Sequence, residues 1–255
     1  WLKACPGAAH AQRPAMPAGH EGMSEAPVRH RWPTPRIVSV EVGDAPESWR
    51  RAGFAVDAEG SCNIGGVGFH LVGGSARGVL RCTVEAEVPL AAGREDVEVN
   101  GFTYRVQAPG TAPPAAAPAE PHACAVTGIL KLEICPLETW DSLTKLVHRV
   151  LPPPFTAFAH KNPDGQPQHV ALWRMQGMEV FEMADNMGAR RDEMNMFFFV
   201  VSDLDAAVAA VGRENCSGIF EQSPGRRAVV LSQRKLGISV RTFLVEPPPP
   251  QAAKL

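Results

Sequence analysis

The sequence lacks several patterns that mark specialised classes of protein. Its 255 residues carry a formal net charge of −2, whereas nucleic-acid-binding proteins usually show a clustered basic face. No apolar run approaches the roughly 18–20 residues that a membrane-spanning helix needs. We therefore predict neither a nucleic-acid nor a membrane partner. The 45% hydrophobic content is typical of a globular protein that buries a core.

Motifs of cofactor and nucleophile chemistry are missing as well. The six cysteines are scattered and no Cys-x-x-Cys occurs, which favours reduced core thiols over a zinc cluster or a disulfide scaffold. The segment NIGGVG at 63–68 lacks the spacing of a nucleotide-binding loop and opens no helix, so it favours a tight hairpin. No G-x-S-x-G nucleophile elbow occurs.

Two segments rich in proline divide the chain. APGTAPPAAAPAEP at 108–121 is typical of an extended, semi-rigid linker, and EPPPPQ at 246–251 marks the end of the folded part. Residues 1–20 contain no Asp or Glu, which fits an Ala/Pro tail and also an organelle transit peptide, so the compartment stays open between cytoplasm and organelle. The predicted division is a disordered tail at 1–35, a first module at 36–107, a linker at 108–123, two modules at 124–246 and a second tail at 247–255.

One local pattern occurs three times between the tails. At 36–57, 128–151 and 194–212, a strand rich in β-branched or aromatic residues gives way to a short helix. Asp44 and Asp203 stand where they can cap the free N–H groups of a helix.

Three strand-like pieces follow each helix, and after the first helix they begin with GFAVD at 53–57. A repeated unit of this kind cannot bury its own sheet face, so two units side by side enclose a cleft. The predicted fold class is α+β, with tandem βαβββ modules that form a curved mixed sheet around a cleft.

Three segments resemble the vicinal oxygen chelate superfamily. They are SVEVGDAPESWRRAGFAVD at 39–57, VSDLDAAVAAVG at 201–212 and QSPGRRAVVLSQRKLGISV at 222–240. The superfamily includes glyoxalase I, extradiol dioxygenases and small antibiotic-resistance proteins such as those against bleomycin. The resemblance spans most of 36–246 and implies the tandem βαβββ fold. It is nearest to glyoxalase-like proteins.

The resemblance also implies where a metal would bind. In metal-using members, His, Gln and Glu on the first and last strands of each module face the cleft and hold a divalent ion such as Fe, Zn, Ni or Mn. Here Lys131 stands on a first strand, Glu179 falls at the position of the metal glutamate, and Arg241 stands on the matching strand of the next module. Lysine is not a usual metal ligand, so we predict no metal cofactor. We expect the ammonium of Lys131 to take the ion's place beside Glu179.

Other side chains are candidates for binding or catalysis. His169 is predicted on a cleft strand, on the same face as Ala171 and Trp173, and with Glu179 it forms the candidate catalytic pair, or the ligand pair if a metal is bound. Arg226 and Arg227 follow a Pro-Gly turn, and only one of them can face the cleft, as a clamp for an anionic substrate. Lys131 and Arg241 are further candidates for substrate binding. The simpler alternatives are a half-buried histidine and a solvated strand edge.

Three functional hypotheses follow. The first is a glyoxalase-like protein with a degraded metal site that binds a small organic molecule or acts without metal. The second is a metal-dependent lyase, isomerase or ring-cleaving dioxygenase of the same superfamily. The third is a non-catalytic protein that binds a partner through the cleft or a sheet edge. A homodimer that completes the sheet of the first module is compatible with each.

Overall fold

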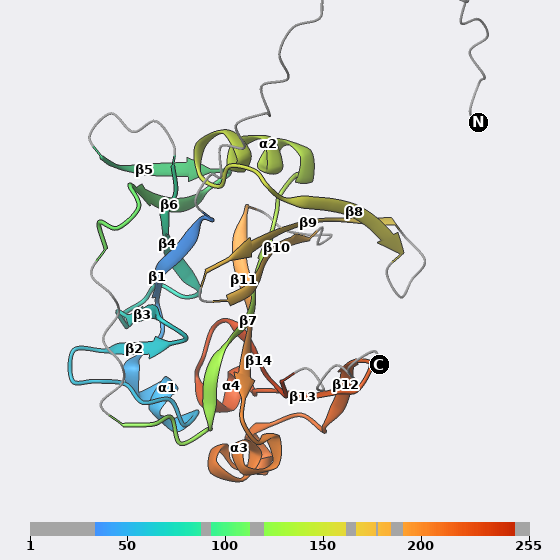
Figure 1. Cartoon of the computed structure of the whole chain (residues 1–255). Helices are drawn as coiled ribbons and strands as arrows, with labels where there is room; N and C mark the ends of the chain where they lie inside the picture. The colour runs from blue at the N-terminus through green and yellow to red at the C-terminus, as the bar shows by residue number, and fades with distance from the viewer. Residues whose placement is uncertain are drawn as a thin grey trace, which may run out of the picture. The chain divides into compact units, whose positions relative to one another are not determined.

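Two β-sheets form the body of the protein (Figure 1). The structure, a computed structural model, describes residues 34–87, 93–112, 120–161, 167–176, 178–184 and 191–247. The predicted tails, and the central part of the predicted linker, lie outside these residues. In the described part, no helix is long and apolar enough to cross a membrane. The cysteines described there are free thiols.

The larger sheet contains two complete βαβββ modules. The first module comprises β7 (Val126–Cys135), α2 (Thr139–Arg149), β8 (Thr156–Lys161), β9 (Pro167–Met175) and β10 (Met178–Ala184). The second comprises β11 (Glu193–Val201), α3 (Leu204–Val211), the 3-10 turn η1 (Arg213–Asn215), β12 (Phe220–Ser223), β13 (Arg226–Val230), α4 (Gln233–Leu236) and β14 (Arg241–Val245). The strand order is β12-β13-β14-β11-β7-β10-β9-β8.

The pairing of these strands explains why two modules form one sheet. In each module the first and last strands are parallel neighbours, β7 with β10 and β11 with β14. The first strands of the two modules, β7 and β11, pair antiparallel at the centre. The predicted curved mixed sheet of tandem βαβββ modules is confirmed here.

The smaller sheet differs from the single module predicted for 36–107. It comprises β1 (Arg36–Val42), α1 (Pro46–Arg51), β2 (Ser61–Ile64), β3 (Val67–Leu71), β4 (Val79–Glu85), β5 (Arg94–Val99) and β6 (Phe102–Gln107). Its order is β2-β3-β1-β4-β6-β5, with β1 parallel to β3, β4 parallel to β6, and β1 antiparallel to β4 at the centre.

This order repeats the plan of the larger sheet with two shortened units, β1–β3 and β4–β6, each of which has three strands instead of four. The predicted strand at 53–57 was wrong, because this segment has no regular structure. Its carbonyl and amide groups bond elsewhere: Gly53 accepts from the backbone N–H of Cys124, and the N–H of Ala55 donates to the imidazole of His122.

An acidic side chain caps the first turn of α2 and of α3, whereas α1 has no side-chain cap. Asp203 caps α3 by accepting a hydrogen bond from the N–H of Ala206, as expected. Glu138 does the same for α2. The expected cap of α1 by Asp44 was wrong: Ala45 holds the N-cap position and makes no side-chain cap, and Asp44 is turned into the interior.

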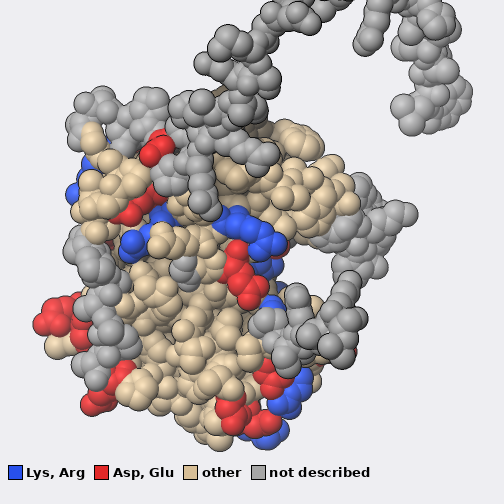
Figure 2. Space-filling model, in the orientation of Figure 1, with Lys and Arg blue, Asp and Glu red and all other residues tan. Residues whose placement is uncertain are grey.

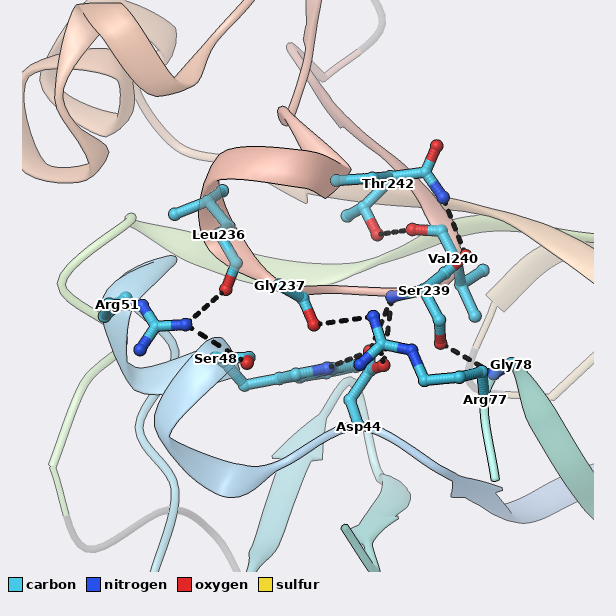
Figure 3. A network of polar contacts seen from close by, with 12 residues as sticks. Asp44, Ser48, Arg51, Arg77, Gly78, Leu236, Gly237, Ser239, Val240 and Thr242 are labelled. Carbon is cyan, nitrogen blue, oxygen red and sulfur yellow. Dashed lines mark hydrogen bonds and ion pairs between the residues drawn. The ribbon is translucent and has the colours of Figure 1, made fainter. Parts of the chain in front are cut away.

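Asp44 instead joins the N-terminal part of the chain to the last module (Figure 3). Its carboxylate is fully buried and accepts hydrogen bonds from the backbone N–H of Ser239 at 2.9 and 3.0 Å and from the indole N–H of Trp49 at 3.1 Å. Arg77 lies 3.8 Å away and donates to the carbonyl of Gly237. The network fixes the turn after α4 against α1 and β4.

One hydrophobic core lies between the two sheets and the helices. Its centre is aromatic: Trp49 of α1 and Phe69 of β3 meet Phe197 and Phe199 of β11, with ring centroids 5.5–6.3 Å apart. The buried faces of α2 and α3 belong to the same core. The smaller sheet and both helices therefore cover one face of the larger sheet, which we call its helix face.

Candidate functional site

The opposite face of the larger sheet carries a second, smaller hydrophobic cluster. It consists of Leu130, Phe198, Ala228, Phe243 and Val245, with Met196, Val200 and Val230 packed against it. We call this surface the cleft face. Figure 1 shows β8 and β9 at one end and β12 and β13 at the other reaching to the side away from the smaller sheet.

An ion pair shows that the cleft face is concave. Arg226 on β13 lies 3.9 Å from Glu179 on β10, although three strands separate β13 from β10. At about 4.8 Å per strand, a flat sheet would hold the two backbones about 19 Å apart, farther than these side chains reach. The sheet must therefore curve, and Figure 2 shows a hollow on this side of the molecule with charged side chains on its wall.

Lys131 lies at the centre of the cleft face between two carboxylates. Its Nζ is 2.7 Å from Oε2 of Glu133 and 2.9 Å from Oε1 of Glu182. All three side chains are largely buried. Burial opposes the charge of Lys131, yet the two carboxylates outweigh it and raise the pKa of the ammonium above its ordinary value. Burial also raises the pKa of Glu133.

The partner of Lys131 differs from the predicted one. Glu179 does lie on the cleft face, but Lys131 pairs with Glu133 and Glu182. The reason is a bulge in β10: the three steps from Met178 to Phe181 lie opposite only two steps on β9, from Met175 to Trp173. The extra residue breaks the alternation of faces, so that Glu179 and Glu182 both leave the helix face.

An aromatic wall stands beside the ammonium. The rings of Phe198 and Phe243 stack with centroids 4.2 Å apart and planes 5° from parallel. Lys131 Nζ lies 4.4 Å from the centroid of Phe198, and the guanidinium of Arg241 lies 5.1 Å from that of Phe243. These are distances at which a cation is attracted to the ring face. Leu130 reaches the same wall because it is an extra residue in the pairing of β7 with β11.

Arg226 and Arg227 take opposite sides of β13, as the alternation of a strand requires. Arg226 shares the cleft face with Ala228 and Val230, and only 12% of its side chain is exposed. Arg227 lies on the other side, where it binds Glu246 at 2.5 Å and Asp205 at 3.2 Å. Of the two predicted arginines, Arg226 is the one that lies on the cleft face.

The predicted histidine, His169, lies elsewhere. The imidazole of His169 is 5.3 Å from the indole of Trp140 on α2, and Ala171 and Trp173 of the same strand belong to the core on the helix face. The three residues do share a face, but it is the helix face, so His169 does not line the cleft. His70 belongs to the smaller sheet, where its Nδ1 lies 3.2 Å from Oγ of Ser61.

The side chains of the cleft face do not fit a divalent metal ion. The residues paired with Lys131 across the four central strands are Phe198 of β11 and Phe243 of β14 on one side and Val180 of β10 on the other. The two nearest carboxylates already hold an ammonium. Over the described ranges, no group of three His, Cys, Asp or Glu side chains is placed to hold a metal. A divalent ion needs imidazole or carboxylate ligands, but these positions hold the ammonium of Lys131 and the rings of Phe198 and Phe243.

Comparison with known proteins identifies the fold. No family model matches the sequence, and no curated protein matches it. Among solved structures, a 2,2',3-trihydroxybiphenyl 1,2-dioxygenase from Sphingomonas wittichii strain RW1 aligns over 84% of this chain and 91% of its own, with 11% identity and a TM-score of 0.55. The 2,3-dioxygenase LapB from Pseudomonas sp. KL28 aligns over 87% and 96%, with 11% identity and a TM-score of 0.53.

A third match is a fusion of a xylose isomerase-like TIM barrel with 4-hydroxyphenylpyruvate dioxygenase, with 11% identity and a TM-score of 0.54. It aligns over 86% of this chain, which spans 49% of that larger protein. At such identities the likeness concerns the fold and not the activity. Together with the order and pairing of the strands, it shows that this chain has the βαβββ fold of the vicinal oxygen chelate superfamily.

Proposed function

We propose that the protein binds a small organic molecule on its cleft face without a metal, and that the ammonium of Lys131 stands in place of the ion. The observation that carries the proposal is the position of Lys131 Nζ, 2.7 and 2.9 Å from two glutamates on the first and last strands of one module. In the resemblance that the sequence carries, these are the strands that supply metal ligands. A buried ammonium satisfies two buried carboxylates that would otherwise be costly.

The apolar wall supports binding of an organic molecule. Phe198 and Phe243 present ring surface next to charged groups, and ligand sites usually combine such surface with a few placed polar groups. Glu179, half-exposed opposite Arg226, is the candidate for proton transfer on this face. His169 is not part of this proposal because it lies on the helix face.

A metal-dependent lyase, isomerase or dioxygenase is the second candidate. It is favoured by the names of the similar structures, which are dioxygenases. It would require Lys131 to leave Glu133 and Glu182. The two candidates therefore differ in a quantity that can be measured, the metal content of the purified protein.

Metal analysis tests the proposal. The protein is purified from cells supplied with iron, zinc, nickel and manganese, and its metal content is measured together with its melting temperature with and without chelator. We expect sub-stoichiometric metal and an unchanged melting temperature. One metal ion per chain, with destabilisation by chelator, would overturn the proposal in favour of the metal-dependent candidate.

Binding is tested with benzamide, a neutral aromatic probe, by methyl NMR. We expect shifts of the methyl groups of Leu130, Val230 and Val245, which line the cleft face. The matched controls are Leu132, Val229 and Leu244, which lie on the same strands but face the main core. Shifts confined to the controls, or none at all with benzamide and with its charged analogues, would contradict small-molecule binding and favour a protein that uses this surface for a partner.

A further inference from the structure

The two neighbouring arginines of β13 differ in how their charges are satisfied. Arg227 donates hydrogen bonds to Glu246 and Asp205 on the helix face. Arg226 is far less exposed, yet it donates no side-chain hydrogen bond to any residue that the structure describes. The carboxylate nearest to it, Glu179, lies 3.9 Å away and is 49% exposed.

This state is unfavourable for a guanidinium. The group carries five N–H donors in a rigid, planar fork, and a buried charge needs both a counter-charge and hydrogen bonds. A separation of 3.9 Å is too long for a hydrogen bond, which ends near about 3.2 Å for N–H···O. Glu179 is therefore a loose counter-ion, and the fork of Arg226 is open toward the cleft.

The surroundings of Arg226 favour an organic anion over a bare ion. Ala228, the next residue of β13 on the same face, and Val245 continue the surface to the aromatic wall. Arg241 lies over the ring of Phe243 at the other end of that wall and forms no ion pair with the described part of the chain. The glutamates near the centre, Glu133 and Glu182, are engaged by Lys131. The cleft face thus offers cations without matched carboxylates at both ends of an apolar surface.

We infer that Arg226 is the receptor for an anionic oxygen group, a carboxylate or a phosphate, on the molecule that binds the cleft face. Two oxygens of one such group match the guanidinium fork and form two parallel charge-assisted hydrogen bonds. The bound anion replaces Glu179 as the counter-charge of Arg226. This inference rests on the proposed function and adds the charge class of the ligand to it.

The experiment compares three probes of similar ring size: benzamide, benzoate and phenyl phosphate. Dissociation constants are measured by the methyl shifts of the cleft face. We expect benzoate, phenyl phosphate or both to bind at least about tenfold more tightly than benzamide, because charge-assisted hydrogen bonds are stronger than neutral ones. The order of the two anions identifies the group that the site prefers.

Two variants assign the preference to Arg226. Arg226→Met should remove the advantage of the anions over benzamide, whereas Arg227→Met should keep it. If Arg226→Met does not fold, Arg226→Lys keeps the charge without the fork and should reduce the advantage. Glu179→Gln should tighten anion binding several-fold, because it removes the competing carboxylate.

The outcomes separate the two claims. Equal affinity for benzamide and both anions at the cleft face would overturn the role of Arg226 and leave the proposed function intact. An anion preference that survives in Arg226→Met would also overturn it. If none of the three probes shifts the methyl groups of the cleft face, the proposed function itself is overturned.

Discussion

The outer face of the smaller sheet and the cleft face of the larger one show two ways of handling charge on a sheet of the same plan. On the smaller sheet, two arginines donate hydrogen bonds to carboxylates directly opposite on the neighbouring strand: Arg81 to Glu41, and Arg105 to Asp96. On the cleft face, one lysine serves two glutamates, and two arginines lack close partners among the described residues.

Under the proposed function, this difference separates a structural surface from a binding surface. Cross-strand pairs at directly opposite positions satisfy each other and leave nothing for a ligand to complete. The cleft face is enclosed by the curvature of its sheet, carries apolar wall as well as charge, and leaves two guanidinium groups open. We therefore propose that the larger sheet carries the function and that the smaller one contributes to the stability of the fold.

Removal of Lys131 should have the largest effect on stability. Lys131→Met leaves two buried carboxylates without a counter-charge, and we expect the free energy of unfolding to fall by about 3–5 kcal/mol in urea titrations. Lys145→Met is the matched control, since Lys145 pairs with Asp141 on the surface of α2, and it should change stability by less than about 1 kcal/mol. The triple variant Lys131→Met, Glu133→Gln, Glu182→Gln should regain part of the loss. Equal, small losses for both lysines would show that the cleft face is no more buried than the helix surface.

Asp44 tests whether the two sheets form one cooperative unit. Asp44→Ala leaves the N–H groups of Ser239 and Trp49 without their acceptor, and we expect a loss of about 2–4 kcal/mol in a single unfolding transition. Asp44→Asn keeps an acceptor and should lose less. Two separate transitions in the wild type would contradict the joint shown in Figure 3 and would mean that the two faces belong to independent parts.

His122 also joins the parts and should make stability depend on pH. Its Nδ1 accepts from the N–H of Ala55 at 2.9 Å and its Nε2 lies 3.0 Å from the carbonyl of Asn63, so the neutral ring is satisfied. Burial lowers the pKa of His122 below its ordinary value. The unfolded chain then binds the proton more readily, so the contribution is full above about pH 6.5 and is lost as the pH falls below it.

The variant His122→Phe checks this dependence. It should lose about 1–2 kcal/mol at pH 7, through the missing hydrogen bonds, and should be less sensitive to acid than the wild type between pH 7 and 5. Urea titrations at both pH values measure the difference. An equal loss of stability on acidification in wild type and variant would exclude His122 as the source.

The smallest effect is expected on the outer face of the smaller sheet. Arg105→Gln removes a surface ion pair in which Nε of Arg105 lies 2.7 Å from Oδ1 of Asp96. Its loss should change the free energy of unfolding by less than about 1 kcal/mol. It should also leave benzamide and benzoate binding unchanged. A change in probe affinity would break the division of roles between the two sheets.

How far the sequence predicts the structure differs between the same two regions. For 124–246, the strand and helix patterns and the Asp203 cap predict both modules, and the helix expected within 128–151 is α2. For 36–107 the sequence predicts a strand at 53–57, but in this segment the N–H of Ala55 donates to the imidazole of His122 and the carbonyl of Gly53 accepts from the N–H of Cys124. Tertiary contacts, which no local pattern contains, decide its conformation.

The site shows the same limit at the level of single side chains. The sequence predicts that a lysine replaces the metal and that one arginine of 226–227 enters the cleft. It does not predict Glu182 as the partner, because a bulge of one residue moves a side chain to the other face and leaves no mark in the alternation. His169 was misplaced for a related reason: its strand alternates as expected, but the face it shares with Trp173 is the one under α2.

The state of the Lys131 ammonium tests the central claim most directly. In ¹⁵N-labelled protein, its Nζ–H resonance can be followed while Zn²⁺ or Mn²⁺ is added. Because the ammonium is hydrogen-bonded to Glu133 and Glu182, we expect a slowly exchanging signal that neither metal shifts or broadens. Loss of that signal with stoichiometric metal binding at the same glutamates would contradict the account.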